Sequence, residues 1–120
     1  KGHAKVVRLL IRGGAAVNQS TTEYGFTPLY MAAGEGHLEV VRQLIDSGAV
    51  VNQATVDDGA TPLYIAAEGG HAKVVSLLIR GGAAVNQART KDGATPLDIA
   101  TQRGHTDVIN LLIGGGATVN

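Results

Sequence analysis

The feature that most constrains the fold of this chain is a sequence repeat with a spacing of 34 residues. Thr-Pro-Leu begins with this spacing at Thr27, Thr61 and Thr95. The histidine of Gly-His recurs at the same interval, at His3, His37, His71 and His105. The asparagine of Val-Asn does so too, at Asn18, Asn52, Asn86 and Asn120. A fixed period of this length is typical of solenoids, in which each unit buries its apolar face against its neighbours.

Residues 59–86 show what one unit contains. Thr61 followed by Pro62 predicts a helix start, because the threonine hydroxyl can cap a free backbone N–H and the fixed φ of proline suits the first helical position. We expect one helix over 63–68 and a second over 71–80, each followed by a pair of glycines that favours helix termination. The second helix carries one apolar stripe, formed by Val74, Val75, Leu77 and Leu78. Neither helix is long enough to be stable alone in water, so the units must stack.

The motifs Thr-Pro-Leu-x-x-Ala-Ala, Gly-His, Val-Val-x-x-Leu-Ile and Gly-Ala-x-Val-Asn together resemble the ankyrin repeat over essentially the whole chain. The resemblance implies an all-α ankyrin-repeat solenoid of stacked helix-turn-helix units with finger-like β-turn loops. The family period is 33, so the extra residue of this chain is expected in the finger. The histidine of the family's Thr-Pro-Leu-His is replaced here by Tyr30, Tyr64 and Asp98. The carboxylate of Asp98 can complete a capping box with Thr95.

We expect a single repeat array over residues 1–120, with a partial repeat at 1–18 and full repeats at 19–52, 53–86 and 87–120. The partial repeat supplies a second helix but no first helix, and neither end has the polar outer face of a capping repeat. A fragment of a longer array, an engineered array and end-to-end self-association are all compatible with such ends. Residues 3–19 and 71–87 differ only at Arg8 versus Ser76, which indicates recent duplication or deliberate design.

Composition argues against several classes of function. The chain has 10 basic and 10 acidic side chains, and this balance argues against a nucleic-acid-binding protein, which needs a basic stripe. No apolar run has the length of a membrane span, and no signal-peptide pattern is visible. The absence of cysteine removes disulfides and thiolate metal sites. An intracellular location is favoured by the family resemblance alone.

No residue pattern predicts an enzyme, a cofactor or a metal site. The histidines occupy equivalent positions in successive units, and neighbouring helices pack roughly 8–10 Å apart, so we expect them to orient the turn between helices rather than share a zinc ion. Asp57-Asp58-Gly59 lacks the later ligands and the closing glutamate of a calcium loop. The glycine clusters lack the Gly-Lys-Ser/Thr ending of a phosphate-binding loop.

The positions that vary between units are the better guide to function. They lie in the fingers and on the exposed face of the first helices, the segments through which ankyrin-repeat proteins usually contact their partners. The resemblance therefore implies non-catalytic binding of a protein partner through the concave face. The candidate partner-binding residues are Glu23, Tyr24, Phe26, Tyr30, Met31, Asp57, Asp58, Tyr64, Glu68, Lys91, Asp92, Gln102 and Arg103. The alternatives are a structural spacer within a longer array and an engineered or model repeat protein.

The aromatic residues all lie in finger and first-helix segments, at Tyr24, Phe26, Tyr30 and Tyr64. Tyr30 and Tyr64 are either binding residues or packing residues between neighbouring first helices. Tyr24 and Phe26 flank a glycine in an exposed turn, where they form either binding anchors or a local hydrophobic clip. Adjacent fingers should project side by side, which would place the aromatic pair beside the carboxylates of the next finger. That combination suits a partner segment with an apolar residue flanked by Lys or Arg.

Overall fold

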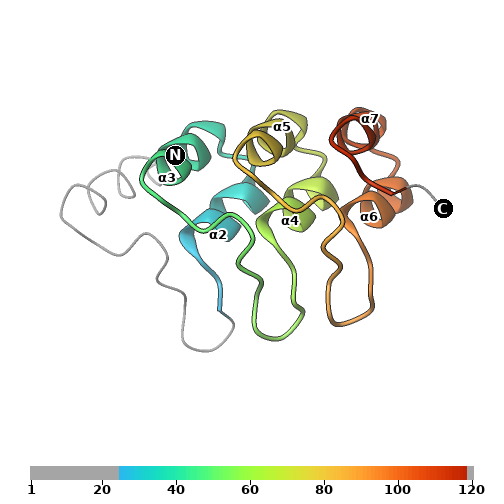
Figure 1. The fold of residues 1–120 in the computed structure, drawn as a ribbon, viewed down its shortest axis with the longest axis horizontal. Coiled ribbons are helices and arrows are strands. Elements are labelled where there is room, and N and C mark those ends of the chain that lie inside the picture. The colour runs from blue at the N-terminus through green and yellow to red at the C-terminus, as the bar shows by residue number, and fades with distance from the viewer. Residues whose placement is uncertain (1–24, 119–120) are drawn as a thin grey trace.

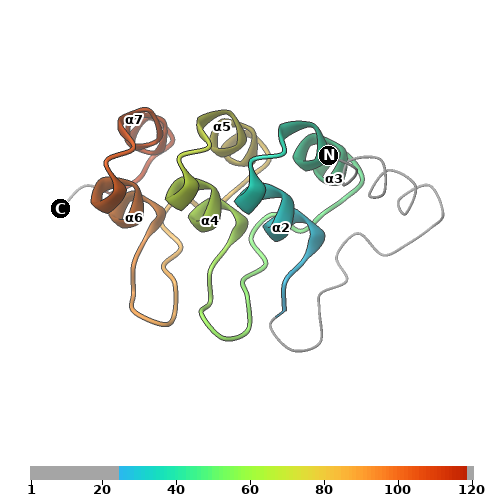
Figure 2. The same ribbon diagram turned by 180° about the vertical axis from the view of Figure 1, so that it is seen from behind.

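The computed structural model describes residues 25–118, which form a stack of paired helices (Figure 1). The pairs are α2 (Pro28–Glu35) with α3 (Leu38–Asp46), α4 (Pro62–Gly69) with α5 (Ala72–Arg80), and α6 (Pro96–Arg103) with α7 (Thr106–Gly114). The first helices α2, α4 and α6 form one row, the second helices α3, α5 and α7 form another, and long loops extend beyond the first row (Figures 1 and 2). The predicted all-α solenoid is confirmed.

Several predictions fall outside the described residues. They are the partial repeat at 1–18, the apolar end face that it would expose for self-association, and the candidate residues Glu23 and Tyr24. The repeat boundaries also stay a prediction. Within residues 25–118, no helix is long and apolar enough to cross a membrane.

The first helices begin where the sequence predicts, at a threonine followed by proline. The Oγ1 atom of Thr61 accepts a hydrogen bond of 3.2 Å from the Tyr64 N–H, and Pro62 occupies the first helical position. In the last pair, Thr95 Oγ1 accepts from the Asp98 N–H at 3.1 Å, while the Asp98 carboxylate accepts from the Thr95 N–H at 3.0 Å. The predicted capping box is therefore present, and it satisfies two backbone donors that a helix start leaves free.

The core follows the predicted apolar stripe of the second helices. Val74, Val75 and Leu78 of α5 are fully buried, whereas Leu77 is only partly buried because it lies at the margin of the stripe. Most equivalent residues of α3 and α7 are also buried, whereas Ile109 of α7 is only partly buried; the buried ones are Val40, Val41, Leu44, Val108 and Leu112. Leucine and alanine side chains of the first helices complete the core from the other row. The core is thus a series of interfaces between neighbouring pairs, as expected of a solenoid.

The repeated histidines join one helix pair to the pair before it. His71 Nε2 lies 3.2 Å from the carbonyl oxygen of Gly34, and His105 Nε2 lies 3.0 Å from that of Glu68. Both acceptors are carbonyls, so Nε2 carries the proton that is donated. Among residues 25–118, no group of three side chains is arranged to hold a metal ion. Because of these two hydrogen bonds, the histidines bridge adjacent repeats in addition to their predicted role in the inter-helix turn.

The repeated asparagines bridge in the opposite direction, to the following pair. The Asn52 side chain donates to the Gly82 carbonyl at 3.2 Å and accepts from the Ala84 N–H at 2.7 Å. Asn86 makes the same two contacts, with Gly116 and Thr118. The Val-Asn motif thus recurs because a side-chain amide can both donate to and accept from the backbone of the next loop.

Candidate binding surface

Successive fingers dock against one another. Val56 lies so close to Gly25 that a Cβ atom added to that glycine would be 2.6 Å from Val56 Cγ2. The finger that contains Val56 also contacts the next finger: the Asp58 carbonyl accepts a hydrogen bond from the Thr90 hydroxyl at 3.2 Å and another from the Lys91 N–H at 3.0 Å. The finger that follows Phe26 in the stack is therefore the one that contains Asp58. Together with the first helices, these fingers form a continuous surface, called here the first-helix surface.

Two aromatic rings stack at the start of this surface. The rings of Phe26 and Tyr30 have centroids 5.1 Å apart and planes inclined by 14°. Both residues are partly buried, and the neighbouring Met31 is 49% exposed. Burial raises the pKa of Tyr30, and the negative charges of Asp58 and Glu68 raise it further. The Tyr30 hydroxyl therefore stays protonated at neutral pH, where it offers a hydrogen-bond donor and an apolar ring rather than a nucleophile.

Tyr64, one repeat later, does not lie on this surface. It is 1% exposed, and the guanidinium carbon of Arg89 lies 4.8 Å from the centroid of its ring. Burial also raises the pKa of Tyr64, although the positive charge of Arg89 opposes that rise. The structure thus places Tyr64 in the packing position that was the alternative to its binding role. Nothing in the sequence singles out Arg89 as the residue that covers the ring.

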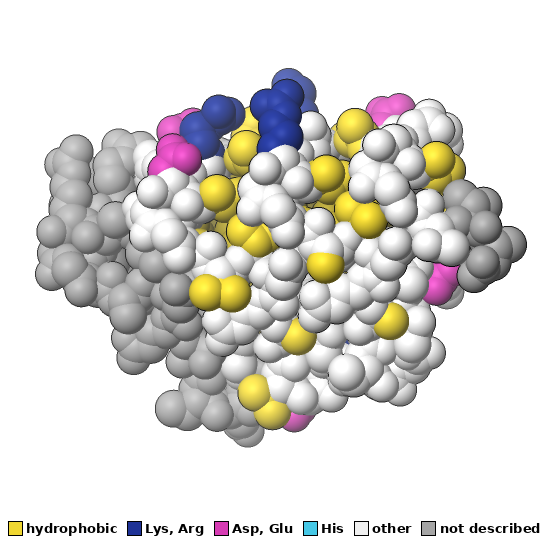
Figure 3. Space-filling model, viewed as in Figure 1, with side chains coloured by type: hydrophobic (Ala, Val, Ile, Leu, Met, Phe, Trp, Pro, Cys, Tyr) yellow, Lys and Arg dark blue, Asp and Glu magenta, His cyan; other side chains and the backbone are white. Residues whose placement is uncertain are grey.

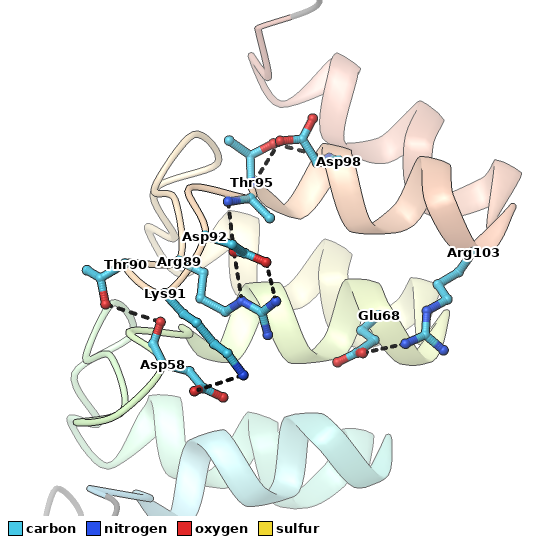
Figure 4. A network of polar contacts seen from close by, with 10 residues as sticks. Asp58, Glu68, Arg89, Thr90, Lys91, Asp92, Thr95, Asp98 and Arg103 are labelled. Atoms are coloured by element: carbon cyan, nitrogen blue, oxygen red, sulfur yellow. Dashed lines mark hydrogen bonds and ion pairs between the residues drawn. The ribbon is translucent and has the colours of Figure 1, made fainter.

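The charged candidates Asp58, Glu68, Lys91, Asp92 and Arg103 form ion pairs on this surface, Asp92 with Arg89, which was not a candidate (Figure 4). Within one finger, Arg89 contacts Asp92 through Nη2 at 2.6 Å and Nε at 3.1 Å. Between fingers, the Lys91 ammonium lies 3.9 Å from the Asp58 carboxylate. Between α4 and α6, Arg103 Nη2 lies 2.8 Å from the Glu68 carboxylate. The remaining candidates Asp57 and Gln102 are exposed. Two of the three ion pairs thus link neighbouring repeats, in addition to any role in binding.

The Arg89–Asp92 pair gives a testable titration. The hydrogen bonds from Arg89, and then the one from the Ala94 N–H, lower the pKa of the Asp92 carboxyl from 3.8 to about 2. A lowered folded-state pKa stabilises the fold above pH 3.8, and that contribution is lost as the pH falls toward about 2. In Arg89→Ala, we expect the pKa of Asp92 to rise toward its ordinary value in a carboxyl NMR titration. Lys91→Ala is the control, since the Lys91 charge is the smallest of the causes. An unchanged Asp92 pKa in Arg89→Ala would show that the pair does not form in solution.

Comparison with known proteins bears on what such a surface does. A family model described as ankyrin repeats (3 copies) matches residues 1–55 and 50–120. A comparison with curated proteins gave no match.

Proposed function

This chain belongs to the ankyrin-repeat family, whose members are generally protein–protein interaction modules, and we propose that it is a non-catalytic module that binds a protein partner through the first-helix surface. The observation that carries the proposal is a difference between two kinds of position: the repeated residues make structural contacts, whereas the varying residues line the first-helix surface. The repeated threonines cap helices, and the repeated histidines and asparagines form hydrogen bonds to neighbouring repeats. Among the described residues, the varying positions place Phe26, Tyr30 and Met31 together at the α2 end of this surface, and the 68% exposed Val56 lies in the next finger. A spacer has no need of aromatic residues there, whereas aromatic residues are favoured binding anchors.

The geometry favours a particular kind of partner segment. An apolar side chain can pack on the stacked Phe26 and Tyr30 rings, next to the half-exposed Met31. A flanking Lys or Arg of the partner can then reach the Asp58 carboxylate of the next finger. The existing contact between Asp58 and Lys91 is long, at 3.9 Å, and both side chains are substantially exposed. Exposed ion pairs of this kind contribute little to stability, so a partner cation can replace Lys91 at small cost.

The proposal is tested by selecting a binder and then removing the anchor. A peptide-display selection against the intact chain supplies the probe, and Kd is measured by isothermal titration for the variants Phe26→Ala and Tyr30→Ala. We expect each variant to weaken binding by about thirtyfold, because truncation of an aromatic hot spot costs about 2 kcal/mol or more.

A matched pair of variants controls for general effects of surface truncation. Met31 is 49% exposed on the first-helix surface, and Ile113 is 44% exposed on the second helix α7. Met31→Ala should weaken binding, whereas Ile113→Ala should leave it unchanged. Unchanged Kd values in both aromatic variants, with helix content preserved, would place the site elsewhere. If the selection yields no binder at all, the spacer alternative is favoured.

A further inference from the structure

The second helices carry a hollow that the first-helix surface does not include. It lies between α3 and α5, and has a volume of about 190 Å³. Its lining residues, called here the α3–α5 basic groove, are Leu38, Arg42, Lys73, Ser76, Leu77 and Arg80. Figure 3 shows Lys and Arg side chains (dark blue) over α3 and α5, with hydrophobic side chains (yellow) beside and below them and acidic side chains (magenta) at the left edge of the cluster and over α7. This mixture of cations and leucines distinguishes the groove from an ordinary solvated helix face.

Helical spacing explains why these residues meet. On α5, Lys73, Leu77 and Arg80 stand at positions i, i+4 and i+7, which lie on one face of a helix. On α3, Leu38 and Arg42 stand at i and i+4, and so share a face as well. Leu77 therefore lies between two cations of α5, Lys73 and Arg80, which are separated by roughly 10 Å along the helix axis, and Leu38 lies one turn before Arg42.

The cations of the groove are largely uncompensated. Lys73 and Arg80 are exposed, and within residues 25–118 neither has an ion-pair partner. Arg42 lies 3.6 Å from Glu39, but both side chains are at least half exposed, so the pairing is weak. The other acidic residue of α3, Asp46, does not line the hollow. The groove thus concentrates positive charge in a chain whose formal net charge is zero.

The positive charge of this groove is not repeated in the equivalent groove of the next repeat. The equivalent positions one period later, between α5 and α7, contain no lysine or arginine: they are Ala72, Ser76, Asp107, Asn110, Leu111 and Gly114. Asp107 replaces Lys73, and Gly114 replaces Arg80. The same backbone therefore presents a cationic face in one place and a weakly acidic face in the next.

We propose that the α3–α5 basic groove binds an acidic amphipathic helix of a second protein partner. The partner's apolar side chains would cover Leu38 and Leu77, and its carboxylates, spaced over two helical turns, would meet Lys73 and Arg80 along the length of α5. The leucines favour this occupant over a nucleic acid or a free phosphate, since a phosphate gains nothing from apolar contact. The groove is formed by second helices alone, so this inference does not depend on the function proposed for the first-helix surface.

The test uses a synthetic helical peptide with leucines one turn apart and glutamates on either side. Binding to the intact chain is followed by fluorescence anisotropy, with the same peptide carrying Glu→Gln changes as the neutral control. We expect the Lys73→Glu/Arg80→Glu double variant to weaken binding about tenfold or more, because it turns two attractive surface pairs into repulsive ones. Phe26→Ala should have no effect, which separates this site from the first-helix surface.

A second variant rebuilds the groove one repeat later. In the Lys73→Glu/Arg80→Glu background, Asp107→Lys with Gly114→Arg supplies the two cations to the groove between α5 and α7, and a Cβ atom at position 114 would meet nothing within 4 Å. We expect binding to recover in part, because the rebuilt groove has Ala72 and Ser76 at the positions of Leu38 and Arg42. Three results would overturn the proposal: no binding of the acidic peptide, equal binding of the neutral peptide, or unchanged binding in the double variant. Tighter binding of duplex DNA or of phosphatidylserine vesicles than of the peptide would also overturn it.

Discussion

Gly59→Ala is expected to lower the free energy of unfolding by about 3 kcal/mol, clearly more than the equivalent change Gly93→Ala. Both glycines close a finger with positive φ, +70° at Gly59 and +74° at Gly93. Alanine in this left-handed region costs about 1–2 kcal/mol. At Gly59 the new Cβ would also lie 2.7 Å from the backbone nitrogen of Thr90 in the next finger, so one of the two fingers must move. Such overpacking adds about 1–3 kcal/mol.

Gly93→Ala serves as the matched control, because a Cβ atom there would meet nothing within 4 Å. It carries the backbone strain without the contact between fingers. Urea unfolding followed by circular dichroism measures both variants, and the difference between them reports the close approach of the two fingers. Equal losses of stability would contradict the docking of fingers that organises the first-helix surface.

The second large effect is expected in the core, where Leu78→Ala should cost about 2–5 kcal/mol. Leu78 is 0% exposed, and its helix α5 contacts α3, α4 and α7. Truncation leaves a cavity that the surrounding helices fill only in part. The loss of stability should extend to the neighbouring repeats, because stability in a repeat array depends on the interfaces between them.

Leu77→Ala gives the comparison for Leu78→Ala. Leu77 precedes Leu78 in the same helix but is only partly buried at the margin of the α3–α5 basic groove. Less apolar area returns to water, so we expect a loss of about 1 kcal/mol. Equal losses at the two positions, by chemical unfolding, would mean that the apolar stripe is not the centre of the core.

The local features of the fold were predictable from the sequence because they depend on nearby residues. The threonine caps and the capping box of Asp98 join residues three positions apart. The histidine and asparagine contacts were harder to predict from the sequence. Their recurrence indicates a structural role, but their partners are backbone groups of neighbouring repeats, and residue identity does not reveal which carbonyl lies opposite.

The candidate site was only partly predictable for a related reason. Lys91 pairs with Asp58 and Arg103 pairs with Glu68, at sequence separations close to one repeat period. Residues one period apart lie side by side in a solenoid, so these pairs were open to prediction from the repeat spacing. The packing role of Tyr64 was one of two alternatives that the sequence left open, but the residue that covers its ring could not be predicted. That residue is Arg89 of the next finger, whose guanidinium lies over the ring and pairs with Asp92.

The central claim is that the first-helix surface binds the partner, and NMR mapping of a bound complex tests it most directly. The selected peptide is titrated into labelled protein, and the amide and methyl shifts of residues 25–118 are followed. We predict that the perturbed residues lie in α2 and its neighbouring fingers, centred on Phe26, Tyr30, Met31 and Asp58. Perturbations confined to α3, α5 and α7 would contradict the claim and would place this partner on the second helices.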